Sequence, residues 1–170
     1  FSHVEAVRRV LRASEPWDVS SSDWGDFSSA LRSSATSRRL VACRIRDRPA
    51  LPFGWFLRLD PPASAAASLA EAWDDDGEAE GPFSLLRSPD GVSLAGMTPL
   101  HQACFCESAP EVVAAFLAGD PSAASSLDRA GSPPLFYARD AGTARLLLDA
   151  APESVALPNK VAGGVPLHFC

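Results

Sequence analysis

Three side chains near the middle of the chain belong to types that bind zinc or act as nucleophiles. If the segment is helical, His101, Cys104 and Cys106 lie within about one and a half turns of one another. Structural zinc sites usually place about two to four residues between paired cysteines, whereas a single residue separates Cys104 from Cys106. We therefore predict that these residues hold no metal ion.

An acidic run at residues 74–82 has the composition of a calcium-binding loop. If Asp76 and Gly77 formed the centre of an EF-hand loop, Ala72 would occupy the first ligand position. Phe83 would then stand where a bidentate glutamate is required. We therefore predict no calcium site and interpret this run as a solvated linker.

One segment is similar to the turn that presents a catalytic serine. Residues 91–96 have the sequence Gly-Val-Ser-Leu-Ala-Gly, which is one residue longer than the Gly-x-Ser-x-Gly elbow. An elbow opens a helix directly, but the helix expected here begins only at Pro99. Of the three histidines that could serve as a base, His101 and His168 belong to a recurring motif. We therefore predict that the chain is not an enzyme and that it binds no cofactor.

Charge is distributed unevenly along the chain. The net charge is −6, but residues 1–60 contain 10 basic and 7 acidic side chains, whereas residues 61–170 contain 5 basic and 14 acidic ones. Surfaces that bind nucleic acid are basic. The acidic second half therefore argues against a nucleic-acid partner.

The cysteine content indicates the cellular compartment, and the length of the apolar runs indicates whether the chain can cross a membrane. Four cysteines in 170 residues lack the density of a secreted disulfide scaffold, so we expect reduced thiols and a cytoplasmic or nuclear location. The longest strongly apolar run, residues 112–117, is far shorter than the roughly 20 residues that cross a bilayer. We therefore expect no association with a membrane.

The N-terminal segment, residues 1–73, is expected to form a small α+β unit of no family that we recognise. Valines at helical spacing behind a Ser-x-x-Glu capping box predict a helix over residues 3–13. Alanine-rich sequence predicts a second helix over residues 63–73. Apolar residues alternate with other residues at 40–46 and 55–59, which predicts two strands that could pair as a β-hairpin.

The segment between the first helix and the first strand is rich in serine and aspartate at its start. Residues 14–26 are therefore expected to form a loop. Trp17 and Trp24 lie within it, and we expect both side chains to anchor the loop in the core.

A motif occurs three times in the second half of the chain. Residues 96–103 have the sequence Gly-Met-Thr-Pro-Leu-His-Gln-Ala, and related segments begin 35 residues later at Gly131 and a further 32 residues on at Gly163. The Thr-Pro-Leu-His-x-Ala sequence and the spacing near 33 residues resemble the ankyrin repeat. The resemblance covers residues 83–170 and implies two whole helix-turn-helix units and the start of a third.

The predicted fold is therefore mainly α. It comprises a solenoid fragment of ankyrin type, preceded by the small α+β segment and the acidic linker. Because the chain begins at Phe1 and the third unit stops at Cys170, we interpret the chain as a fragment. About three repeats are usually needed for stability, so the N-terminal segment is expected to cap the array.

The resemblance assigns structural roles to the motif residues. It implies that Thr98 caps a short helix, that the ring of His101 hydrogen-bonds neighbouring backbone, and that Cys104 is a small buried residue. In the middle unit, Pro133 and Phe136 replace the threonine and the histidine. The residues that carry the motif are Thr98, Pro99, Leu100, His101, Ala103, Pro134, Leu135, Ala138, Pro166, Leu167 and His168.

The resemblance also implies a function in protein binding, through the projecting turns and the inner helix face. The residues at those positions are Met97, Phe105, Cys106, Arg129, Ala130, Ser132, Asp140 and Val161. Phe105 is the strongest candidate anchor, because large aromatic side chains dominate interface energetics. Its side chain could equally pack against the N-terminal segment.

Two other interpretations stay open. The repeats could be the targeting arm of an enzyme or regulatory protein whose catalytic residues lie outside this chain. The chain could also be a structural unit without a partner, since alanine and serine are frequent on the expected binding face.

Overall fold

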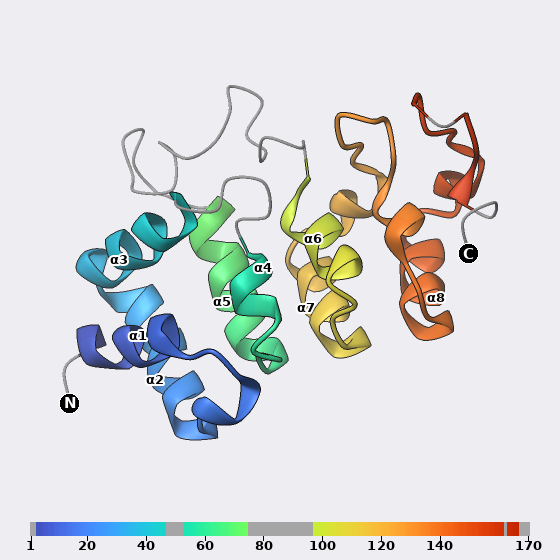
Figure 1. Ribbon diagram of the computed structural model, residues 1–170. Coiled ribbons are helices and arrows are strands. Elements are labelled where there is room, and N and C mark those ends of the chain that lie inside the picture. Colours follow the sequence, from blue (N-terminus) through green and yellow to red (C-terminus); the bar gives the residue numbers. More distant parts are fainter. Residues whose placement is uncertain (1–2, 47–52, 75–96, 162, 167–170) are drawn as a thin grey trace.

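Every regular element in the described part of the chain is helical (Figure 1). The computed structural model describes residues 3–46, 53–74, 97–161 and 163–166. The α-helices are α1 (His3–Arg12), α2 (Ser21–Ser33), α3 (Ala35–Arg46), α4 (Gly54–Leu57), α5 (Ala63–Asp74), α6 (Pro99–Phe105), α7 (Pro110–Gly119) and α8 (Ala141–Ala150). The short 3-10 helices are η1 (Pro16–Asp18), η3 (Pro121–Ser125), η4 (Pro134–Tyr137) and η5 (Pro152–Ala156). Within these ranges, none of the helices is long and apolar enough to span a bilayer.

Helices α1 and α5 occupy the segments where the sequence predicts helices. α1 lies within residues 3–13 and buries Val7 and Val10 completely. α5 covers the alanine-rich segment and buries Leu69. Most of the predicted linker, residues 75–82, lies outside the described residues.

The serine-rich segment predicted as a loop instead begins helix α2. The Ser20 hydroxyl accepts a hydrogen bond from the N–H of Asp23, and the Asp23 carboxylate accepts one from the N–H of Ser20. The serines and the aspartate are thus helix-capping residues. The helix buries Trp24 and Phe27, but Trp17 is 79% exposed, so only one of the two expected anchors reaches the core.

The first predicted strand, residues 40–46, is wrong because these residues belong to helix α3. Ser37 and Val41, which are one helical turn apart, are both fully buried. The buried serine extends the apolar face at helical spacing, whereas a search for alternating apolar residues counts it as polar. Ser34 opens the helix by accepting a hydrogen bond from the N–H of Ser37 at 3.2 Å.

The second predicted strand, residues 55–59, is wrong as well, since its first part forms helix α4. Phe53, Phe56 and Leu57 are buried, and their spacing of three and four residues is that of one helical face. No strand occurs among the residues that the structure describes, so the predicted β-hairpin does not form there.

The motif at residues 96–103 leads into a pair of helices, α6 and α7. The Thr98 hydroxyl caps α6 by accepting a hydrogen bond from the N–H of His101, and Pro99 occupies the first helical position. After the turn, Pro110 opens α7, and Pro121 follows the end of that helix. Together the two helices form one helix-turn-helix unit.

The second unit replaces its first α-helix with the 3-10 helix η4. Pro133 stands in the cap position and has no side chain that could accept a hydrogen bond. Asp140 then caps α8 by accepting a hydrogen bond from the N–H of Thr143 at 2.8 Å. The first helix of this unit thus has four residues, against seven in α6.

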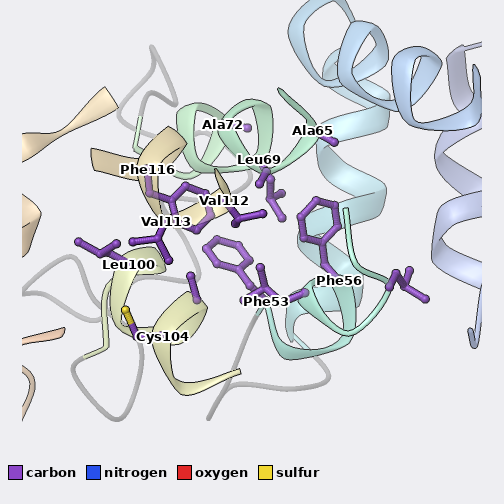
Figure 2. Close-up of a cluster of buried hydrophobic side chains, with 14 of the residues drawn as sticks. Phe53, Phe56, Ala65, Leu69, Ala72, Leu100, Cys104, Val112, Val113 and Phe116 are labelled. Atoms are coloured by element: carbon purple, nitrogen blue, oxygen red, sulfur yellow. The ribbon is translucent and has the colours of Figure 1, made fainter. Parts of the chain in front are cut away.

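Successive helices stack in a row across the molecule (Figure 1). α5 packs against α2 on one side and α7 on the other, and α7 packs against α8. Figure 2 shows Phe53, Phe56 and Leu69 of the N-terminal half gathered with Val112 and Phe116 of α7 in one buried cluster. The N-terminal half therefore covers the first face of the repeat units.

Candidate functional site

The side chain of His101 joins the first repeat unit to the second. Its ring is fully buried, and Nδ1 accepts a hydrogen bond from the N–H of Thr98 at 3.2 Å. Nε2 lies 3.0 Å from the carbonyl oxygen of Ser132 in the next unit. Because an N–H can only donate and a carbonyl can only accept, Nε2 must carry the proton. The neutral ring thus bridges the two units.

Burial favours the neutral form of this histidine. Loss of solvent lowers the pKa of His101 below its ordinary value of 6.5, while the carbonyl of Ser132 and the charge of Asp128 oppose the shift. Protonation at Nδ1 would also direct an N–H toward the N–H of Thr98. The hydrogen bonds of both ring nitrogens therefore give His101 a structural role.

Two projecting turns of the second half each close with a glycine in a left-handed conformation. Asp128 opens the first turn, and its carbonyl accepts a hydrogen bond from the N–H of Gly131 at 3.0 Å. Asn159 opens the second turn, which is one residue longer, and its carbonyl accepts a hydrogen bond from the N–H of Gly163 at 2.8 Å. Both glycines have positive φ values, 77° and 72°, which residues with a Cβ rarely adopt. The equivalent Gly96 lies outside the described residues.

The same two turns are hydrogen-bonded to each other. The N–H of Lys160 donates to the carbonyl oxygen of Ala130 at 2.7 Å. The Nδ2 of Asn159 donates to the hydroxyl of Ser132 at 2.6 Å, and this hydroxyl is fully buried. These bonds hold the tips of adjacent turns side by side.

Asp128 is a buried carboxylate with partners on both oxygens. Oδ1 accepts hydrogen bonds from the N–H groups of Ala130 and Ser132, each at 2.9 Å, and Oδ2 accepts one from the hydroxyl of Tyr137. Burial and then the bond to Asp128 raise the pKa of Tyr137 to about 12. The phenol therefore stays protonated, and the bond fixes its ring.

The ring of Tyr137 is the centre of an aromatic cluster formed by the first helices of the two units. Its centroid lies 5.8 Å from that of Phe105, 5.5 Å from that of Phe136 and 6.2 Å from that of His101. Phe105 is 52% exposed. The cluster therefore presents a fixed aromatic surface to solvent.

Cys104 in α6 and Cys106 at the C-terminal cap of this helix are poor metal ligands and poor nucleophiles. Burial raises the pKa of Cys104 to about 12. Burial also raises the pKa of Cys106, an effect that the positive charge of Arg58 opposes. Metal binding and nucleophilic attack both need the thiolate, which this environment disfavours. Both ring nitrogens of His101 are already engaged with backbone groups.

A family comparison agrees with this geometry. Residues 95–126 match the family model of the ankyrin repeat, a span that includes α6, α7 and η3. This chain carries an ankyrin repeat. No curated protein and no solved structure matches the chain significantly. Ankyrin repeats are generally interaction modules without catalytic activity.

The structure places the expected partner-facing residues of the repeat units in different environments. The exposed ones are Phe105, Arg129, Asp140 and Val161, and the half-buried ones are Cys106 and Ala130. Met97 and Ser132 are 6% and 0% exposed, so their prediction as partner-facing side chains is wrong. Both lie in the packed interior where the turns meet the first helices.

Most of the motif residues that the structure describes are buried or half-buried in the packing between elements. Leu100, His101, Ala103, Leu135 and Ala138 are buried. Pro134 and Pro166 are buried as well, whereas Thr98 and Pro99 are half-buried at the start of α6. Leu167 and His168 lie outside the described residues.

Three further residues that stabilise this arrangement were not singled out from the sequence. Gln102 is fully buried, and its side chain accepts from the N–H of Phe53 and donates to the carbonyl of Met97. Asp128 and Asn159 open the two turns. An Asp or Asn shortly before Gly131 and before Gly163 is a signal that could have identified the turn residues.

Proposed function

We propose that this chain is a protein-interaction module of ankyrin-repeat type. The observation that carries the proposal is the position of Phe105, which is 52% exposed and rests on the ring of Tyr137 at 5.8 Å. A large aromatic side chain held on a rigid base loses little conformational entropy on binding. The platform is rigid because the hydroxyl of Tyr137 is bonded to the buried carboxylate of Asp128.

The projecting turns supply the second part of the proposed binding face. Arg129 is exposed at the tip of the first turn, and Val161 is 85% exposed at the tip of the second. Ala130 lies between them, and its carbonyl accepts the hydrogen bond from Lys160 that joins the turns. Asp140 is exposed too, but its carboxylate caps α8, so we expect it to contribute less.

The proposed partner is a protein, and the proposed compartment is the cytoplasm or the nucleus. The acidic balance of residues 61–170 supports a protein partner over a nucleic acid. The free thiols of Cys43, Cys104 and Cys106 support a reducing compartment.

Selection of short random peptides displayed on phage tests the proposal. We expect the intact chain to enrich specific peptides, and Phe105→Ala to reduce their affinity by about tenfold or more, as loss of an interface anchor does. The matched control is Trp17→Ala, which removes an exposed aromatic side chain from the N-terminal end of the chain. Equal binding by the wild type and Phe105→Ala would refute the proposed face.

A further inference from the structure

Residues 53–74 reproduce the local structure of α6 and α7, 47 positions earlier in the chain. Asp60 and Glu107 both have left-handed backbones, with φ values of 51° and 56°, and no other described non-glycine residue has a positive φ. The N–H of Asp60 donates to the carbonyl of Leu57 at 3.2 Å, and that of Glu107 to Cys104 at 3.1 Å. The same turn therefore separates α4 from α5 and α6 from α7.

Burial follows the same correspondence. α5 begins at Ala63 and α7 begins at Pro110, at this same offset. The corresponding residues that are buried in both segments are Phe53 and Leu100, Phe56 and Ala103, Leu57 and Cys104, Ala65 and Val112, Ala66 and Val113, and Leu69 and Phe116. α5 also packs along α7, and α4 lies beside α6 (Figures 1 and 2). Residues 53–74 thus form a divergent repeat unit stacked before the first recognised one.

The correspondence identifies a further residue on the binding face. Arg58 stands at the position of Phe105, and both side chains are exposed. The positive charge of Arg58 acts to lower the pKa of Cys106, which follows Phe105 in the sequence. Ion pairs in the described residues join Arg8 to Glu5 and Arg9 to Asp23, so they do not engage Arg58.

Two more cations lie at the opposite end of this face, on the projecting turns. Arg129 and Lys160 are exposed on adjacent turns. The carboxylate of Asp128 between them accepts three hydrogen bonds from within its own unit. Helices α6 and η4, which form the surface between the turns and Phe105, contain no acidic residue.

Most of the exposed acidic side chains of the two units lie away from the first helices. Glu111, Asp120, Asp149 and Glu153 lie on or next to the second helices and the 3-10 helices after them, whereas Glu107 and Asp140 are exposed in the turns that follow the first helices. Six of the 14 acidic residues of the second half lie in residues 74–90, before the first unit, so they do not belong to the first helices. The first-helix face combines cations with an aromatic centre.

We propose that this face binds an acidic peptide segment of a protein partner, with an apolar side chain between its carboxylates. The apolar side chain contacts Phe105 and Tyr137, while the carboxylates meet Arg58 at one end and Lys160 with Arg129 at the other. This inference rests on the proposed function and adds the chemistry of the partner.

Phage selection with the intact chain, followed by fluorescence polarisation with the enriched peptides, tests the inference. We expect enriched peptides to carry Asp or Glu on both sides of Phe, Leu or Trp. Arg58→Glu and Lys160→Glu should each weaken binding by about tenfold, because each loses a charge-assisted contact and gains a repulsion. Higher salt should weaken binding as well. Arg145→Glu, on the outer helix α8, is the matched control and should leave affinity unchanged.

Each outcome decides the question. Enrichment of neutral or basic peptides that need Phe105 would overturn this inference and leave the proposed function intact. Equal effects of Arg58→Glu and Arg145→Glu would also overturn it, whereas enrichment of no peptide would contradict both proposals. If an oligothymidylate displaced the peptides and bound more tightly than they do, the positively charged side chains would be a nucleic-acid-binding site instead. Arg58→Gln, which removes the positive charge without reversing it, serves if the melting temperature of Arg58→Glu falls.

Discussion

The backbone N–H of Phe53 lies 3.0 Å from Oε1 of Gln102, and this buried hydrogen bond ties the N-terminal half to the ankyrin repeat. Leu69 of α5 lies in the same buried cluster as Val112 and Phe116 of α7 (Figure 2). The stability of repeat arrays depends on contacts between neighbours. Since about three repeats are usually needed for stability, we expect these contacts of the N-terminal half to stabilise the repeat units.

Leu69→Ala is expected to destabilise the repeats as well as the N-terminal half. The side chain is 1% exposed, so its truncation should lower the free energy of unfolding by about 2–5 kcal/mol. Urea denaturation followed by circular dichroism should still show one transition, shifted to lower urea. The control Leu127→Ala truncates a side chain that is 46% exposed and should cost less than about 1 kcal/mol. A transition that splits, with the repeat signal unmoved, would show that the two halves are independent.

The neutral state of His101 predicts a loss of stability in mild acid. The unfolded chain binds a proton at this residue near pH 6.5, but burial lowers the pKa in the folded chain. The unfolded state thus gains protons first, so the free energy of unfolding is retained above about pH 6.5 and decreases as the pH falls below it. Melting temperatures between about pH 8 and about pH 5 measure this decrease.

A pair of histidine variants separates this effect from general acid sensitivity. His101→Gln should be less stable at neutral pH and should lack the decrease between about pH 6.5 and 5. His3→Gln changes an exposed side chain and should keep the wild-type profile. A His101→Gln profile parallel to that of the wild type would rule out this histidine as the cause.

Local capping rules predict part of this fold from the sequence alone. Thr98 and Pro99 define the start of α6, because a cap and a first-turn proline act through their own backbone neighbours. The predictions of two strands were wrong for a different reason. Ser37 is buried although polar, and Phe56 is buried in a helix of four residues, so apolar alternation describes neither environment.

The divergent repeat unit could not be recognised from the sequence for two reasons. Phe53, Gly54 and Phe56 stand in place of the Leu, His and Ala of the motif, and the offset of 47 positions exceeds the period near 33. Its shape depends instead on the left-handed turn at Asp60 and on packing against α7. Tertiary contacts of this kind leave no local signal in the sequence.

Replacing glycine by alanine is expected to change the free energy of unfolding in opposite directions in a turn and in a helix. Gly131→Ala should lower the free energy of unfolding by about 1–2 kcal/mol or more, because φ is 77° and a new Cβ would lie 2.9 Å from Cγ of Lys160. Gly25→Ala, inside α2 and free of neighbours within 4 Å, should raise it by about 0.5–1 kcal/mol. Chemical denaturation of the two variants measures both changes in the free energy of unfolding. Stabilisation by Gly131→Ala would contradict the turn geometry.

Thiol labelling should distinguish the cysteines by their burial. Cys43 is exposed, whereas Cys104 is 2% exposed and burial raises its pKa to about 12. A maleimide reacts with the thiolate, so Cys43 should react within minutes and Cys104 only when the repeat opens. Mass spectrometry of digested samples assigns each modified site over time. In Leu69→Ala, labelling of Cys104 should accelerate, since α5 stabilises the repeat that buries it. Rapid labelling of Cys104 in the intact wild-type chain would contradict its place in the core.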